Sequence, residues 1–153
     1  MQVQQIATTE IATCRPDTNL AAVAKLMWDR DCGFVPVVDA AGKVAGVITD
    51  RDICIASATR RLLPDRINAA QAMRRQPIQT TQPEETIDKA LATMKQQQVR
   101  RLPVIAADGT LKGVISMNDI VLASQRKEGP APSDIVSTLA AICAHRPATA
   151  AAA

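Results

Sequence analysis

One stretch of the chain occurs twice: GKVAGVITDRDI at residues 42–53 and GTLKGVISMNDI at residues 109–120. The similarity extends in both directions, so that residues 13–57 align with residues 80–124 at a constant offset of 67 without a gap. Fourteen of the 45 aligned residues are identical, including two glycines and two prolines. Glycines and prolines that match in register indicate a duplicated structural unit. The sequence therefore predicts two copies of one fold within 153 residues.

Each copy predicts the same order of elements: a short strand, a helix, a hairpin of two strands and a second helix. Asn19 and Thr86 are candidate N-caps, each followed by apolar residues at helical spacing. Asp108-Gly109 between two apolar runs predicts a hairpin turn, and Gly42 takes that place in the first copy. The expected ranges are 11–14 and 78–81 for the short strands, and about 50–60 and 117–126 for the second helices.

The duplication predicts three parts of the chain. The first repeat is expected at residues 1–66, the second at 67–127, and a C-terminal part at 128–153 with an amphipathic helix over 134–144 and a disordered tail. One copy is too small to cover its own apolar sheet face, so we expect the two sheets to pack together. The predicted fold class is α+β (α/β-like), with two small sheets related by a pseudo-two-fold axis and flanked by helices.

Composition argues against several classes of function. There are 18 Lys and Arg against 15 Asp and Glu, and a net charge of +3 is too small to indicate a nucleic-acid partner. Because His145 is the one histidine, we expect no metal site and no enzyme. Four scattered cysteines without a Cys-x-x-Cys motif favour a reducing cytoplasm. No apolar run is long enough for a membrane span, and no secretory leader is recognisable.

The stretches GFVPVVDAAGKVAGVITDRDI (33–53) and VRRLPVIAADGTLKGVISMNDI (99–120) resemble a tandem pair of cystathionine-β-synthase (CBS) domains, called a Bateman module. The resemblance covers about residues 1–127 and is to the small stand-alone bacterial type. It implies two clefts between the repeats that bind an adenosine-containing ligand: AMP, ADP, ATP, NAD or S-adenosylmethionine. It also implies a homodimer. Because 153 residues leave no room for an appended catalytic domain, we expect a protein target in trans.

The family motif, Gly-h-h-Thr/Ser-x-x-Asp, falls at the junction of the second strand and the second helix of each repeat. A helix N-terminus offers free N–H groups to a phosphate, the Thr or Ser hydroxyl adds a hydrogen bond, and the Asp carboxylate suits a ribose diol. The spacings Thr49-x-x-Asp52 and Ser116-x-x-Asp119 are also those of a capping box. Spacing alone leaves both interpretations open, and the surrounding repeat favours a ligand site.

The resemblance implies a first cleft at the motif of the second repeat, where a pair of arginines reaches the phosphate. Its expected residues are Arg100, Arg101, Ser116, Asn118 and Asp119, with adenine contacts from residues 8–11, which include Thr9, and from Cys32, Gly33 and Phe34. The alternative for the two arginines is a solvated surface pair. In the second cleft Gly33 and Phe34 stand in place of the arginines, so we expect it to hold an anionic nucleotide less well. Its expected residues are Thr49, Arg51, Asp52, Gln76, Ile78 and Val99.

The favoured function is a regulatory adenosine-nucleotide-binding module that senses its ligand between the repeats and signals through its dimer or a partner. No cofactor is expected to be required. The alternative is a structural dimerisation module with degenerate, ligand-free clefts. Trp28, next to the apolar stripe of the first helix, is a candidate contact of the dimer.

Overall fold

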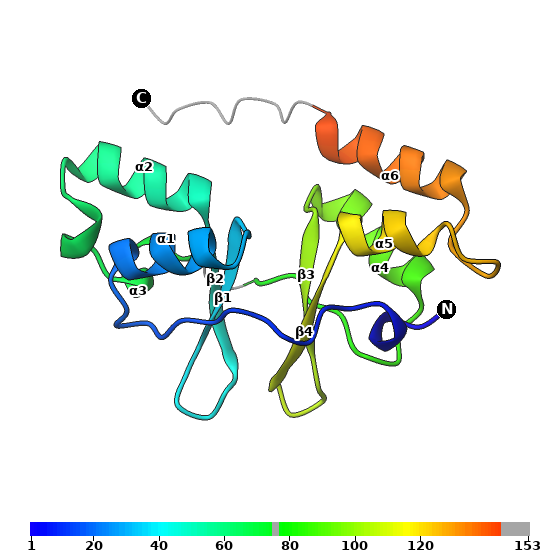
Figure 1. Cartoon of the computed structure of the whole chain (residues 1–153), viewed down its shortest axis with the longest axis horizontal. Helices are drawn as coiled ribbons and strands as arrows, with labels where there is room; N and C mark the ends of the chain where they lie inside the picture. The colour runs from blue at the N-terminus through cyan, green and yellow to red at the C-terminus, as the bar shows by residue number, and fades with distance from the viewer. Residues whose placement is uncertain (75–76, 145–153) are drawn as a thin grey trace.

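The computed structural model describes residues 1–74 and 77–144. Each repeat forms a β-hairpin with helices packed on it (Figure 1). The first repeat contains η1 (Val3–Gln5), α1 (Leu20–Asp29), β1 (Phe34–Val38), β2 (Val44–Thr49) and α2 (Asp50–Arg60). The second contains α4 (Ile87–Gln97), β3 (Arg101–Ile105), β4 (Leu111–Ser116) and α5 (Met117–Ala123). Between them lie η2 (Pro64–Arg66) and α3 (Ala69–Ala72), and α6 (Pro132–Cys143) follows. The predicted fold class is confirmed: helices combine with two small antiparallel sheets.

Local signals account for the start of the first helices and for the hairpin turns. Asn19 Oδ1 accepts a hydrogen bond from the Ala22 amide at 2.9 Å, and α1 begins at the next residue. Thr86 caps α4 in the same way. Gly42 and Gly109, at the hairpin tips, have φ angles of 75° and 85°, which glycine adopts without steric cost. These predicted caps and turns are confirmed.

The two hairpins share one register, so the offset of 67 holds in three dimensions. Pro36 faces Val47 in the first hairpin, and Pro103 faces Val114 in the second. Each ladder has an irregularity near the end of its first strand. The duplication is therefore one of structure as well as of sequence.

The prediction of short strands at residues 11–14 and 78–81 is wrong. Each segment makes a single parallel bridge, Cys14 to Val37 and Thr81 to Val104. The Cys14 amide donates a hydrogen bond to the Pro36 carbonyl. Extending the ladder from Cys14 toward residue 11 would need an N–H from Pro36, and proline has none. Pro103 limits the ladder of the second repeat in the same way.

The second helix of the second repeat is shorter than expected. α5 ends at Ala123 rather than near Arg126. Gly129 packs so closely on the Ala123 carbonyl that a Cβ could not fit there. The chain therefore turns back at the end of α5 and leads into α6.

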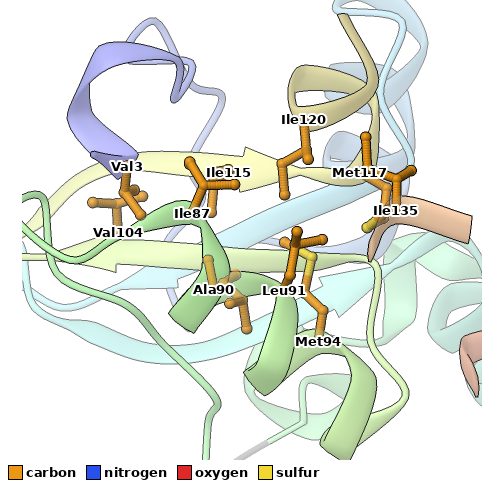
Figure 2. Packing of buried hydrophobic residues seen from close by; sticks show 11 residues of the cluster. Val3, Ile87, Ala90, Leu91, Met94, Val104, Ile115, Met117, Ile120 and Ile135 are labelled. Carbon is orange, nitrogen blue, oxygen red and sulfur yellow. The ribbon is translucent and has the colours of Figure 1, made fainter. Parts of the chain in front are cut away.

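Buried apolar residues form two clusters, one in each repeat. Figure 2 shows the cluster of the second repeat, which includes Ile87, Met94 and Ile115. Val3, from the N-terminus, belongs to this second cluster, whereas Ile67 belongs to the first. The start of the chain thus packs on the second repeat, and the segment between the repeats packs on the first. The repeat boundaries at residues 66 and 127 stay predictions.

The C-terminal helix α6 lies against α4 and α5 of the second repeat (Figure 1). Ile135 is buried in that repeat's cluster, and Leu139 and Ile142 pack against it. The apolar face expected for this helix is therefore confirmed, with the helix starting at Pro132. Proline suits the first turn of a helix because an N–H at that position would have no partner within the helix. His145 and the rest of the expected disordered tail lie outside the described residues.

Replacing Leu102 by Ala should lower the free energy of unfolding by about 2–5 kcal/mol, because the side chain is fully buried and its loss leaves a cavity. Leu63→Ala is the matched control, since Leu63 is 71% exposed and should change stability by less than about 0.5 kcal/mol. Urea unfolding followed by circular dichroism measures both. Equal losses in the free energy of unfolding of the two variants would contradict the burial of Leu102.

Burial raises the pKa of the Cys14 thiol to about 11. At pH 8 we expect a thiol reagent to modify the exposed Cys54 and Cys143 well before Cys14, as followed by mass spectrometry. Because the unfolded thiol ionises at about pH 8.5, this burial contributes fully to stability below that pH and less as the pH rises toward 11. Modification of Cys14 at the rate of Cys54 would contradict its burial.

Candidate functional site

The N-terminal segment docks on β4 of the second repeat before it crosses to the first (Figure 1). Thr8 and Val114 exchange both backbone hydrogen bonds, at 3.0 Å and 2.9 Å. The contact depends on Gly113, because a Cβ there would lie 2.7 Å from the Thr8 carbonyl oxygen. Residues 8–12 therefore run beside the junction between β4 and α5.

A reciprocal capping box closes that junction. Ser116 Oγ accepts a hydrogen bond from the Asp119 amide at 3.3 Å. Asp119 Oδ2 in turn accepts from the Ser116 amide at 2.7 Å and from its hydroxyl at 2.6 Å. The capping interpretation is confirmed, but it engages one carboxylate oxygen. The other oxygen, Oδ1, accepts a hydrogen bond from the Thr8 hydroxyl at 3.3 Å and so faces the N-terminal segment.

A cavity of about 260 Å³ lies where the N-terminal segment, the start of the first hairpin and the β4–α5 junction meet. Its lining residues are Thr8, Glu10, Ile11, Ala12, Arg30, Asp31, Cys32, Phe34, Pro36, Arg101, Val114, Ser116, Asn118 and Asp119. These residues come from both repeats, so a molecule in this ligand cavity would contact both.

Most residues expected in the first cleft line the ligand cavity: Cys32, Phe34, Arg101, Ser116, Asn118 and Asp119, together with residues 8, 10 and 11. The other three do not. The neighbours of Thr9, residues 8 and 10, line the cavity in its place. Gly33 lines a separate hollow beside α1. Arg100 is exposed, and its carbonyl accepts a hydrogen bond from the Met117 amide at 3.0 Å.

Sequence reasoning missed Arg30 and Asp31, which follow the last turn of α1 and line the cavity. Asp31 has a left-handed φ of 48°, and Gln98 has a φ of 51° at the same place in the second repeat. This conformation ends each first helix and turns the chain toward the hairpin. Both missed residues directly precede Cys32, so extending the expected site to the helix end would have found them.

The lining of the ligand cavity carries charges of both signs. Arg30 and Arg101 contribute two positive charges, and Glu10, Asp31 and Asp119 contribute three negative charges. Its formal charge is therefore 2 − 3 = −1, although the whole chain carries +3. The carboxylates can accept hydrogen bonds from hydroxyl and amino groups, and the two guanidinium groups can donate hydrogen bonds to an anion.

An arginine occupies the equivalent junction of the first repeat. Thr49 and Asp52 form the same capping box, but the other carboxylate oxygen of Asp52 pairs with Arg74 Nε at 3.1 Å. Arg74 exchanges backbone hydrogen bonds with Val47, just as Thr8 does with β4. The two junctions thus differ in what faces the aspartate: a hydroxyl in one and a guanidinium in the other.

The other residues expected in the second cleft do not join Thr49 and Asp52 in a common cavity. Arg51 is exposed on α2, Ile78 is half-buried, and Val99 packs against the core of the second repeat. Gln76 lies outside the described residues. Neither the ligand cavity nor the hollow beside α1 is lined by Thr49, Asp52 or these residues.

Residues 1–74 and 77–144 hold neither a metal-binding cluster nor a membrane-spanning helix. No group of three or more His, Cys, Asp or Glu side chains there could hold a metal ion. No helix in that part of the chain has the length and apolar character needed to cross a membrane.

Comparison with known proteins agrees with the duplication. The family model described as CBS domain matches residues 3–59 and again residues 69–126. Inosine-5′-monophosphate dehydrogenase of Mycobacterium leprae is 33% identical over 117 residues, which make up 76% of this chain and 21% of that enzyme. The chain thus spans about a fifth of that relative.

Solved structures with a similar fold include complexes with adenosine compounds. The CBS domain pair of protein MJ0100 in complex with 5′-methylthioadenosine and S-adenosyl-L-methionine is 22% identical, with a TM-score of 0.73 over 82% of this chain and 98% of that one. CBSX2 in complex with AMP is 20% identical, with a TM-score of 0.70 over 81% and 96%. At these identities the likeness establishes the fold.

Replacing Gly113 by Ala should lower the free energy of unfolding by about 1–3 kcal/mol, because the new methyl group would press on the Thr8 carbonyl. It should also speed amide hydrogen exchange at Thr8 and Val114. Gly42→Ala is the control: no heavy atom lies within 4 Å of its Cβ, so only left-handed strain of about 1–2 kcal/mol remains. Unchanged exchange at Thr8 in the Gly113 variant would contradict the docking contact.

Proposed function

The chain belongs to the CBS domain family, and from its ligand cavity we propose that it is a regulatory module that binds an adenosine-containing ligand between its two repeats. The orientation of Asp119 carries the proposal. Oδ2 is held by the capping box, while Oδ1 faces the cavity with a single hydroxyl partner from Thr8. A carboxylate already ordered in this way can accept the hydrogen bonds of a ribose diol at a low entropic cost.

The rest of the lining suits the other parts of such a ligand. Arg101 is the cation that we assign to a phosphate or carboxylate, because guanidinium groups bind these anions through paired hydrogen bonds. Ile11, Phe34 and Pro36 offer apolar surface for a purine ring. Ser116 and Asn118 add polar groups next to Asp119.

The charge of the cavity favours AMP or S-adenosylmethionine over ATP. The lining has a formal charge of −1, so it attracts the cationic sulfonium of S-adenosylmethionine, and it repels the several charges of ATP more strongly than those of AMP. A cavity of about 260 Å³ is also small for a dinucleotide such as NAD. AMP in CBSX2, and 5′-methylthioadenosine and S-adenosyl-L-methionine in MJ0100, support an adenosine compound as the ligand here.

We further propose that the two clefts are unequal. In the second cleft, expected from Thr49, Arg51, Asp52, Gln76, Ile78 and Val99, a ribose would have to displace Arg74 from Asp52. Half of the Arg74 side chain is exposed, so this ion pair costs at most about 1 kcal/mol to break. The first cleft needs no such displacement and should fill first.

A ligand that touches both repeats can act as a signal only if it binds one packing of the repeats more tightly than another. We propose that this change reaches a homodimer partner or a protein target in trans, in the cytoplasm and without catalysis by this chain. The exposed apolar side chains Val121, Leu122 and Val136 on α5 and α6 are candidate dimer contacts. The second candidate function, a structural dimerisation module with ligand-free clefts, rests on the Arg74–Asp52 pair that already fills one junction.

Isothermal titration of the ligand-stripped protein with AMP, ATP, NAD and S-adenosylmethionine tests the proposal. We expect AMP or S-adenosylmethionine to bind with a Kd on the order of micromolar, and ATP to bind roughly tenfold more weakly. Asp119→Ala should weaken the binding about tenfold or more, because it removes the acceptor for the ribose hydroxyls.

Asp52→Ala is the matched control for Asp119→Ala, since each variant loses one capping box at a cost of about 1 kcal/mol in stability. Only the Asp119 variant alters the ligand cavity. Equal losses of affinity in the two variants would contradict the assignment of Asp119. No heat from any of the four compounds at two temperatures would favour the structural module.

A further inference from the structure

The lining of the ligand cavity divides into a half-buried inner part and an exposed rim. Arg101 and Asp119 are half-buried, and with one charge of each sign they leave the inner part neutral. Glu10, Arg30 and Asp31 are exposed, so the rim carries two negative charges and one positive charge. The formal charge of −1 on the lining therefore lies at the rim, where any part of a ligand that extends out of the inner cavity would meet it.

The charged side chains of the rim are available to a ligand. No ion pair within residues 1–74 and 77–144 involves Glu10, Arg30 or Asp31. At the other junction, by contrast, Asp52 already pairs with Arg74 at 3.1 Å. A cation that approaches the rim would therefore not have to displace a cation of the protein.

The acidic rim is not a requirement of the fold. The offset of 67 carries Arg30 and Asp31 to Gln97 and Gln98, which are uncharged. Gln98 adopts the same left-handed conformation as Asp31 and ends its helix in the same way. The turn at the end of the first helix thus accepts glutamine as well as aspartate, so the turn does not explain the negative charge of Asp31.

We propose that the ligand cavity selects an adenosine compound with a cationic amino-acid tail, of the S-adenosylmethionine class, and that Glu10 and Asp31 determine this selectivity. The inference rests on the proposed function, because it requires an adenosine group between the repeats with its ribose at Asp119. The tail of such a compound carries a sulfonium, an ammonium and a carboxylate group. The two cations suit the carboxylates of the rim, and the carboxylate of the tail suits the guanidinium groups of Arg30 and Arg101.

AMP should use the same lining less well. Its phosphate can pair with Arg101, but it carries charge of the same sign as Glu10 and Asp31. Because charges at an exposed rim interact partly through water, each carboxylate should change the affinity by a small factor. The whole chain carries +3, which would favour AMP, so a preference for the cation can come only from charges close to the ligand. Such a preference should shrink as salt is added.

The test is isothermal titration of the full, ligand-stripped chain with four compounds that share the adenosine group. S-adenosylmethionine has both cations, S-adenosylhomocysteine keeps the ammonium alone, 5′-methylthioadenosine has no tail, and AMP has a phosphate. At low salt we expect S-adenosylmethionine to bind roughly tenfold more tightly than AMP and about threefold more tightly than 5′-methylthioadenosine. S-adenosylhomocysteine separates the two cations: an affinity near that of S-adenosylmethionine assigns the recognition to the ammonium, and one near that of 5′-methylthioadenosine assigns it to the sulfonium.

Variants assign the preference to the rim. Glu10→Gln combined with Asp31→Asn removes both charges, and asparagine accepts the left-handed conformation of residue 31. The double variant should bind AMP at least as tightly as S-adenosylmethionine, because the formal charge of the lining changes from −1 to +1. Arg30→Gln should act in the opposite direction and raise the preference for S-adenosylmethionine about threefold. Opposite effects of neighbouring residues separate a charge effect from general damage to the site.

Asp29→Asn is the matched control for Asp31→Asn. Asp29 ends α1, pairs with Lys25 at 2.7 Å and does not line the ligand cavity. Its replacement makes the same chemical change two residues away, so the ratio of the affinities for S-adenosylmethionine and AMP should equal that of the parent chain.

Two results would overturn the inference and leave the proposed function in place. One is AMP or 5′-methylthioadenosine binding to the parent chain as tightly as S-adenosylmethionine. The other is a preference for S-adenosylmethionine that persists in the double variant at Glu10 and Asp31. Binding of none of the four compounds would instead contradict the proposed function, and the inference with it.

Discussion

The close approach of the N-terminal segment to β4 at Gly113 is the contact on which the ligand cavity depends. With no side chain at Gly113, Thr8 can exchange two backbone hydrogen bonds with Val114. The segment then passes the β4–α5 junction on its way to the first repeat. Without this contact, residues 8–12 would not form a wall of the cavity, and the repeats would lose one of the connections that hold them side by side (Figure 1).

The same arrangement explains how one aspartate can serve both stability and recognition. Asp119 has two carboxylate oxygens, and the capping box requires one of them. The capping interaction orders the side chain at the start of α5, so Oδ1, which accepts a hydrogen bond from the Thr8 hydroxyl, is already oriented when a ligand arrives. In the first repeat the duplicated Asp52 is ordered in the same way, but the crossing segment there presents Arg74. A single difference between two crossing segments thus separates an open junction from a filled one.

Much of the fold could be predicted because its signals are local. The caps at Asn19 and Thr86 and the turn at Gly109 each act within a few residues, and the duplication confirmed each prediction by repeating it. The segments ahead of the first helices were mispredicted as strands, because the effect of Pro36 on a neighbouring segment is visible only once the two are paired.

The site was predicted in part for the same reason. Ser116 and Asp119 lie in a motif that is contiguous in sequence, and Arg101 is next to it in the fold's hairpin. Asp31 and Arg74 depend on how a helix end or a crossing segment docks, which spacing does not encode. The charges of the lining were therefore predicted in part: the sequence pointed to Arg101 and Asp119, and the structure adds Arg30 and Asp31.

A crystal structure of the chain grown with AMP would show whether the nucleotide lies between the repeats at Asp119. We expect the nucleotide between residues 8–12 and the β4–α5 junction, with its ribose hydroxyls within hydrogen-bond distance of Asp119 Oδ1 and its phosphate at Arg101. A nucleotide bound at Asp52 alone, with Arg74 displaced and the ligand cavity still open, would contradict it.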